Sequence, residues 1–472
     1  HGNAWGLNTP PATSLDKQLT REQHSPDQQF LFELFSGHGN SEEYRDWRAV
    51  AFDSEGRAFC PEPGDSYEPC CWRAGKIIQE RCTAEGLDTE TCAQREYAAR
   101  QHFVDAGVSG HLTVPGQTPD DWLNCGQCED CFLPGMDHRP ATTAQYALAL
   151  SNTSEAGDPL RFNFGLIGSS DNHASRGGSG YKESQRLGMT ETYGARDKKF
   201  AARMAGKKKP PIASSEAFAL DSKVGLANKR NMERQSSFWF TGGLVAVHSE
   251  GRQREAIWRG LRNKEVYATS GDRILLWFNL LDGSSSQAMG SSLTTSHNPR
   301  FKVTAIGAFE QRPGCPAFTS NLLNKEQLEA MCLGECYHPS EKRKIIDRIE
   351  VVRIRPKLTP NEAIAPLIED PWRSFTCEEN EKGCQIEFED PDYANAARDT
   401  LYYVRAIQRM TPTINAGGLR CARDAQGQCI SVEPCYGDYR SDANDDCLAP
   451  SGERAWSSPI FLTYRDLDSS TK

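Results

Sequence analysis

Two short apolar runs, each followed by a polar turn, constrain the fold of this chain more than any other feature. The first run covers residues 30–35, carries a single carboxylate at Glu33, and ends at a turn that contains His38. The second covers residues 161–167 and leads into the turn Gly-Ser-Ser-Asp-Asn-His at 168–173. Two segments with helical patterns lie between them, 74–82 and 95–106. Strands that alternate with helices predict parallel β/α units, in which polar side chains gather where the strands end.

The first half of the chain continues this plan to about residue 271. A strand is expected at 241–247, a helix at 252–262 and a further segment at 265–271. From about residue 273 the hydrophobic period changes to two, and short strands follow one another without long helices. These strands are expected at 274–278, 301–305, 348–354, 386–388, 401–407 and 459–462. Such a series is typical of a β-sandwich.

The sequence therefore predicts an α/β domain followed by an all-β domain. The α/β domain is expected over residues 1–280 and the β-sandwich over residues 281–472. A chain of 472 residues is long enough for two hydrophobic cores. Within the first domain we expect a cysteine-rich insertion at about 55–140 and a basic loop at about 195–235. The basic loop lacks an apolar period and is either a solvated loop or a flap over an anionic substrate.

The chain contains 17 cysteines, which gather at 60–131 and 315–447. Irregular, turn-rich spacings indicate disulfides and an oxidising location, either secreted or periplasmic. The alternative is metal binding, because Cys125, Cys128 and Cys131 match the start of an iron–sulfur ferredoxin motif. That motif needs a fourth cysteine before a nearby proline, and Pro140 arrives without one. Since 17 is odd, at least one thiol lacks a partner within the chain.

The overall charge and hydropathy exclude some classes of protein. The formal net charge of −10 argues against a general nucleic-acid-binding protein. No apolar run approaches the roughly 18 residues that a membrane span needs, so no transmembrane segment is expected. The chain opens at His1 without a methionine or a signal-like segment, and an upstream part is therefore expected. The sequence identifies no protein partner.

Asp171 and His173 directly follow a predicted strand and are the main candidates for chemistry. A carboxylate oxygen and an imidazole nitrogen at this spacing can converge on one divalent cation. The alternative is that Asp171 caps the next helix and His173 lies on the surface. Metal binding is favoured because Glu33 and His38 lie at the end of the first strand and His1 has a Gly-Asn context. These five residues can supply ligands to a cluster of two or three metal ions.

A cluster of this kind suits the hydrolysis of phosphate esters, since several metal ions stabilise both the attacking and the departing oxygen. Zinc, manganese and iron all accept mixed histidine and carboxylate ligands. Arg176 and Lys182 follow the Asp-x-His pair and are candidates for binding an anionic substrate group, with ordinary surface charge as the alternative. The chain has neither a serine-hydrolase elbow with suitable partners nor a nucleotide-binding motif.

Two oxygen-rich loops in the second domain are candidates for binding calcium. They cover residues 424–427 and 442–446 and lie between cysteines. Neither carries a complete calcium-binding pattern, so ordinary turn chemistry is the favoured interpretation.

At these residues the chain resembles the polymerase and histidinol phosphatase (PHP) superfamily, and more closely its secreted bacterial branch catalogued as domain of unknown function 3604. The matching segments are 1–3, 33–42, 168–173, 242–247, 254–258 and 265–271. The resemblance implies a distorted seven-stranded β/α barrel with a metal cluster at the carboxyl ends of its strands, and hydrolysis of phosphate esters. It also implies that His1 is a later histidine ligand of the cluster, and that Asp171 and His173 form its closing motif. The opening His-x-His motif, the next acidic residue and the bridging glutamate are expected upstream of His1.

The expected function is that of a secreted or periplasmic metal-dependent phosphoesterase, with Asp171 and His173 in catalysis and a small anionic ester as substrate. A variant hypothesis is that the same cluster cleaves another anionic ester, such as a sulfate. A hypothesis of another class is an extracellular binding or assembly protein that keeps a degenerate barrel and engages a partner through its sandwich. A third, a cysteine-ligated redox protein, predicts visible absorbance.

Overall fold

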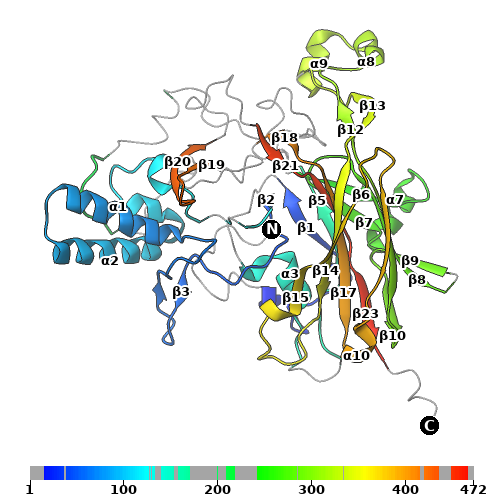
Figure 1. The fold of residues 1–472 in the computed structure, drawn as a ribbon, viewed down its shortest axis with the longest axis horizontal. Coiled ribbons are helices and arrows are strands. Elements are labelled where there is room, and N and C mark those ends of the chain that lie inside the picture. The colour runs from blue at the N-terminus through cyan, green and yellow to red at the C-terminus, as the bar shows by residue number, and fades with distance from the viewer. Residues whose placement is uncertain are drawn as a thin grey trace.

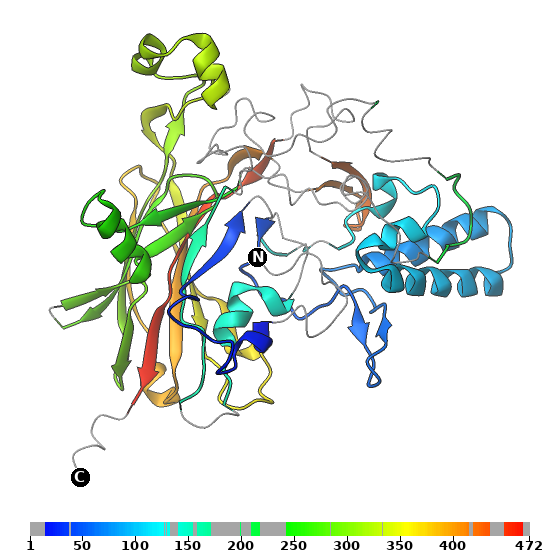
Figure 2. The same ribbon diagram turned by 180° about the vertical axis from the view of Figure 1, so that it is seen from behind.

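The structure is a computed structural model of the chain, and it describes the residues in separate stretches. These are 15–36, 39–126, 128, 130–132, 140–153, 158–170, 199, 209–217, 242–283, 285–332, 334–414, 419–434 and 448–465. The described residues form a mixed α/β protein, as predicted, with several β-sheets, a helical unit to one side and a projecting arm (Figure 1, Figure 2).

The two apolar runs of the first half form neighbouring strands. A three-stranded sheet has the order β2-β1-β5, with bounds β1 (Leu31–Ser36), β2 (Gly39–Asn40) and β5 (Gly165–Gly168). β1 and β5 run parallel, with Leu31 opposite Gly165 and Glu33 opposite Ile167. The parallel arrangement of these two strands is therefore confirmed. The seven-stranded barrel stays a prediction, because the described residues place these strands in a sheet of three.

A larger sheet contains eight strands. Its path is β10-β23-β17-β22-β7-β6, and β14 pairs with β17 and β15. The bounds are β6 (Leu244–Val247), β7 (Val266–Thr269), β10 (Ser292–Thr295), β14 (Ile346–Ile354), β15 (Ile368–Thr376), β17 (Thr400–Gln408), β22 (Arg454–Ser457) and β23 (Ile460–Tyr464). Because β7 pairs with β22, strands from both sides of residue 280 share this sheet.

A four-stranded sheet faces the large one and makes the predicted sandwich. It has the order β16-β11-β8-β9, with bounds β8 (Leu275–Asp282), β9 (Ser285–Ala288), β11 (Arg300–Ile306) and β16 (Cys384–Glu389). Phe278 and Phe301 from this sheet pack with Tyr402 and Val404 of β17 in one core. Alternate residues of β8 and β11 point into that core, which explains the period of two in their sequences.

The other face of the large sheet is covered by β1 and β5, so the large sheet is the middle layer. Leu34 and Leu166 share a second core with Tyr403 and Trp456 of the large sheet. Residues of β17 alternate between the two cores, and all nine are buried. The strand therefore reads as an almost continuous apolar run. This packing fixes the ends of β1 and β5 against β7 and β22.

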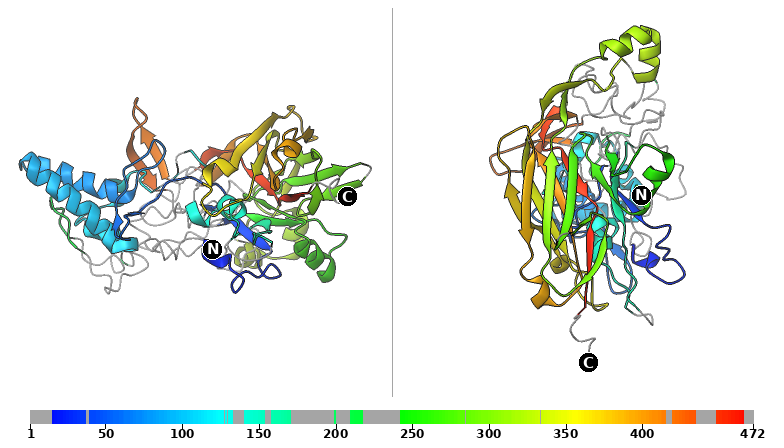
Figure 3. Two further views of the ribbon diagram at one scale, coloured as in Figure 1. Left: turned by 90° about the horizontal axis from the view of Figure 1, so that it is seen from below. Right: turned by 90° about the vertical axis from the view of Figure 1, so that its right-hand side faces the viewer.

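The cysteine-rich insertion folds as a helical unit beside the sandwich (Figure 3). Its helices are α1 (Cys70–Ala84) and α2 (Thr89–Ala106). The Asp88 side chain caps α2 by accepting the Thr91 N–H at 2.9 Å, as expected of an N-cap carboxylate. Six cysteine pairs in the described chain are disulfide-bonded: Cys60–Cys71, Cys70–Cys125, Cys82–Cys92, Cys128–Cys131, Cys315–Cys336 and Cys377–Cys384.

The remaining elements are short. The helices are α3 (Ala144–Ala149), α7 (Arg254–Arg262) and α10 (Tyr393–Ala396). Three pairs of strands are β3 (Ala51–Phe52) with β4 (Ala58–Phe59), β18 (Thr411–Ile414) with β21 (Leu448–Ser451), and β19 (Leu419–Arg423) with β20 (Cys429–Pro434). The projecting arm consists of β12 (Phe309–Gln311), α8 (Ala317–Leu322), α9 (Lys325–Cys332) and β13 (Pro339–Arg343). Within the described stretches, no helix combines the length and apolar character of a membrane span.

Candidate functional site

The carboxyl ends of β1, β5 and β7 meet at one edge of the core. Ser169 N–H donates to Phe35 O at 2.9 Å, and Gly243 N–H donates to Ser169 O at 2.7 Å. A Cβ built on Gly168 would lie 3.1 Å from Thr269 O, and one on Gly243 only 2.5 Å from the same oxygen. Four backbone segments therefore touch here, namely the ends of β1, β5 and β7 and the residue before β6. Glycine is required at position 243 because any side chain would overlap Thr269.

Glu33, half-buried on β1, is the one predicted site residue that the structure describes. The others lie outside the described residues: His1, His38, Asp171, His173, Arg176 and Lys182. In the sequence, Asp171 directly follows Ser170, and His38 lies two positions after Ser36. The prediction that both polar turns follow neighbouring parallel strands is thus confirmed for the strands. The placement of the ligand side chains stays a prediction.

Arg454, the first residue of β22, lies at the same edge and was not found from the sequence. Its backbone N–H donates to Ser270 Oγ at 2.9 Å, and Ser270 N–H donates to Arg454 O at 2.9 Å. These two residues are 184 positions apart, so only the pairing of β22 with β7 brings the arginine to the site. No local sequence motif around Arg454 indicates that it lies at this edge.

The Arg454 side chain is partly buried and forms no ion pair with a carboxylate of the described residues. Its Cζ lies 3.7 Å from the centre of the Phe132 ring, and its buried Nε has no hydrogen-bond partner in the described chain. Burial, together with the charge of Arg405, lowers the pKa of Arg454. An arginine stays protonated even so, and a buried cation without a paired anion is costly. The guanidinium is therefore suited to bind an anionic group at this edge.

An aromatic cluster supports the arginine. The Trp456 ring stacks on Phe35, with 5.6 Å between centroids, and the Phe132 ring lies 5.9 Å from Phe35 and 5.8 Å from Trp456. Phe35 belongs to β1 and Trp456 to β22, so the cluster joins the two sheets directly beneath the edge. The Phe132 ring of this cluster contacts the Arg454 guanidinium.

The loop that follows β2 is held by a buried ion network centred on Glu42. Arg405 Nε donates to Glu42 Oε1 at 2.7 Å and Tyr403 OH donates to the same oxygen at 2.6 Å. Trp456 Nε1 donates to Glu42 Oε2. Burial raises the pKa of Glu42 to about 7, against the lowering effect of Arg405. With both oxygens engaged, this carboxylate holds the loop in place and is not free to bind a metal ion.

Arg405 completes the network on the side of the large sheet. Its Nη1 and Nη2 donate to the two oxygens of Asp370 at 2.5 and 2.6 Å, and Nη1 also donates to Glu350 at 3.3 Å. Gln145 Nε2 donates to Asp370 at 2.7 Å and connects α3 to the same group. Strands β14, β15 and β17 thus anchor the loop between β2 and the helical unit.

A second buried acidic cluster lies behind Arg454. Ser270 Oγ donates to Glu453, whose pKa is raised to about 7 by burial and by the neighbouring Asp272. Lys344 Nζ lies 2.8 Å from Asp272 Oδ2, and Gln408 Nε2 donates to that oxygen. The cluster ties the turn after β7 to the base of the arm.

A metal site needs several ligand atoms close together. Among the stretches that the structure describes, three or more His, Cys, Asp or Glu ligand atoms come within 4.8 Å of one another only at Cys315, Cys332 and Cys336. Those cysteines belong to the arm and not to the predicted site. Of the predicted calcium loops, Asp424 Oδ1 accepts the N–H groups of Gln426 and Gln428, both at 2.9 Å, as in an ordinary turn. Residues 442–446 lie outside the described chain.

The cysteines of the suspected iron–sulfur motif are paired: Cys125 with Cys70, and Cys128 with Cys131. This favours the disulfide interpretation. The described part of the basic loop, 209–217, is attached to the helical unit. Arg95 Nη1 donates to Ala213 O at 2.8 Å, and Glu216 N–H donates to Thr113 O at 2.8 Å. Two backbone groups of this stretch are thus bonded to α2 and the turn after it, while residues 209–211, 216 and 217 are exposed, and the choice between a solvated loop and a flap stays a prediction.

The fold and the edge define a disulfide-bonded α/β protein with a cationic group at the ends of parallel strands. Residues 147–306 match the model of the family described as "Protein of unknown function (DUF3604)". The matched segment begins in α3, contains β5 to β10, and ends with β11. It supports the family that the sequence resemblance indicated. No curated protein and no solved structure matches the chain.

Proposed function

We propose that this chain is a secreted or periplasmic metal-dependent phosphoesterase whose active site lies at the carboxyl ends of β1, β5 and β7. The observation that carries the proposal is the guanidinium of Arg454, which lies at this edge with a buried Nε that has no hydrogen-bond partner among the described residues. The resemblance to the PHP superfamily supports the same reaction class, and six disulfide-bonded pairs support an oxidising location.

In this proposal Arg454 binds the non-bridging oxygens of the phosphoryl group and offsets the charge that develops on them. Asp171 and His173, with Glu33, His38 and His1, hold two or three zinc, manganese or iron ions, which supply Lewis acidity. Arg176 and Lys182 provide further positive charge for the substrate. The aromatic cluster and the Glu42 network orient Arg454 and the loop after β2 and keep water from the guanidinium's inner side.

The test combines metal analysis with a substrate panel on the full-length protein. The expected result is stoichiometric metal and hydrolysis of an aryl phosphate monoester or diester. Arg454→Met should lower kcat/KM by about 10²–10³, as the loss of a charged transition-state donor typically does. The matched control is Arg300→Met, which removes an exposed arginine of β11 and should leave kcat/KM unchanged.

Other outcomes separate the alternatives. Hydrolysis of an aryl sulfate without hydrolysis of phosphates would support the same active site with sulfate esters, and not phosphate esters, as its substrates. A colourless protein without metal or esterase activity would refute the proposal and support the extracellular binding or assembly function instead.

A further inference from the structure

The arm carries three cysteines near its tip and projects away from both cores (Figure 1). Cys315 precedes α8, Cys332 is the last residue of α9, and Cys336 lies before β13. Large apolar side chains of the arm are exposed to solvent: Phe318, Leu322 and Met331. Reagents in solution can therefore reach the arm without unfolding the rest of the protein.

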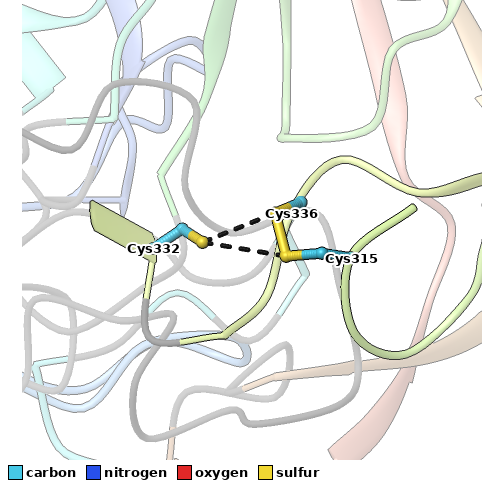
Figure 4. Close-up of side chains that lie close together, drawn as sticks. All are labelled: Cys315, Cys332 and Cys336. Carbon is cyan, nitrogen blue, oxygen red and sulfur yellow. Dashed lines mark hydrogen bonds between the residues drawn. A yellow bond between two sulfur atoms is a disulfide. The ribbon is translucent and has the colours of Figure 1, made fainter. Parts of the chain in front are cut away.

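The three sulfur atoms lie within contact distance of one another (Figure 4). Cys315 and Cys336 form a disulfide, and Cys332 keeps its thiol. The Cys332 sulfur lies 3.5 Å from the Cys336 sulfur and 3.9 Å from that of Cys315. A thiol beside a disulfide has the components of an exchange reaction, in which a thiolate attacks one sulfur and displaces the other.

We propose that Cys315, Cys332 and Cys336 form a thiol–disulfide exchange site that accepts low-molecular-weight disulfides. In the internal step, the Cys332 thiolate attacks the Cys336 sulfur, which is the nearer one. The Cys332–Cys336 bond forms, the Cys315–Cys336 bond breaks, and Cys315 leaves as a thiolate that takes a proton from water. No oxidant or reductant is consumed, and the single thiol moves from Cys332 to Cys315.

The second step joins the site to a reagent. Whichever thiolate is free attacks one sulfur of an external disulfide, and a mixed disulfide with the protein forms. The other half of the reagent leaves as a thiolate and is protonated by water. The proposal is independent of the esterase function, since the arm lies outside the edge formed by β1, β5 and β7.

The local backbone permits the internal step. The nearly equal sulfur distances place the Cys332 thiol beside the disulfide. Its side chain must therefore turn before its sulfur lies in line with the Cys315–Cys336 bond. Cys332 is the last residue of α9, and its thiol donates to Leu328 O at 3.2 Å, a weak bond that breaks when the side chain turns. Gly334 adopts a positive φ of 77° and gives the short link to Cys336 a tight turn.

The experiment uses the full chain with its disulfides intact and oxidised glutathione as the probe. The reaction is quenched with acid, and peptides are mapped by mass spectrometry without reduction. We expect glutathione adducts on both Cys332 and Cys315, with the Cys315 adduct accompanied by a Cys332–Cys336 disulfide. The yield should rise with pH because the thiolate is the nucleophile.

Two variants test the pathway. Cys332→Ser removes the internal nucleophile, and the Cys332 adduct with it, and should lower the Cys315 adduct by about tenfold or more. In Cys315→Ser, oxidised glutathione should oxidise the Cys332 and Cys336 thiols to a disulfide and leave as two molecules of reduced glutathione, so the arm keeps no glutathione. The Cys377–Cys384 disulfide serves as an internal control and should stay unmodified. An adduct confined to Cys332 in the wild type would overturn the exchange, as would Cys315→Ser protein with two free thiols on the arm.

Discussion

Replacing Arg405 by methionine tests the ion network that holds the loop after β2. The variant removes the guanidinium that bonds Glu42 at 2.7 Å and Asp370 at 2.5 and 2.6 Å, and leaves two buried carboxylates without their cation. Breaking a buried ion pair by removing one partner costs about 3–5 kcal/mol. Methionine fills much of the arginine's volume, so most of this loss comes from the unpaired charges and little from a cavity.

The free energy of unfolding is measured by urea titration with tryptophan fluorescence, for which Trp456 is a probe inside the network. Arg300→Met again serves as the control, because Arg300 is exposed on β11. The double variant Arg405→Met with Asp370→Asn should lose less than the sum of the two single losses, since each removes a charge that the other leaves unpaired. A loss below about 1 kcal/mol for Arg405→Met, similar to a surface substitution, would refute the interpretation of this network.

Two further predictions concern the edge itself. The pKa of Glu453 is raised from 4.5 to about 7, so the folded state binds more protons than the unfolded state in this range, and stability falls as pH rises from about 4.5 to 7. This group contributes about 3 kcal/mol at most to the loss of stability. Glu453→Gln should reduce the difference in unfolding free energy between pH 5 and pH 8, measured by urea titration, to the part that is due to Glu42. An unchanged difference would contradict the raised pKa of Glu453. Gly243→Ala should lower the free energy of unfolding by about 1–3 kcal/mol because its Cβ would overlap Thr269 O. Gly64→Ala is the control and should not lower it, since nothing lies near a Cβ at that position. Equal thermal midpoints for the two variants would show that the strand ends do not touch.

Local patterns in the sequence predicted the main strands of the cores and the longer helices. The run at 30–35 became β1, the change to period two near 273 marked the strands of the sandwich, and the helical patterns became α1, α2 and α7. These signals succeed because burial on one face of a helix or strand imposes its own period on neighbouring residues. Export-type disulfides were also predicted from the number of cysteines, while their connectivity depends on contacts that spacing does not encode.

Local patterns do not predict which strands distant in the sequence pair with one another. The sequence placed β6 and β7 with the α/β half, and nothing local indicates that β22 pairs with β7 and joins them to the sandwich. Arg454 was missed for the same reason, since its position beside Ser270 depends on that pairing. Glu33 was predicted because it lies within an apolar run that ends at a polar turn, and its position on β1 at this edge agrees with the predicted strand, while its role as a ligand stays a prediction.

In the proposed function, the edge formed by β1, β5 and β7 binds a phosphoryl group through Arg454. Calorimetric titration of the full-length protein with inorganic phosphate, the product of a phosphate monoester, tests this most directly. We expect saturable binding to the wild type and a dissociation constant about 10–100 times higher for Arg454→Met, as for the loss of one charge-assisted contact. Equal affinity in the two proteins, or no phosphate binding to the wild type, would contradict it.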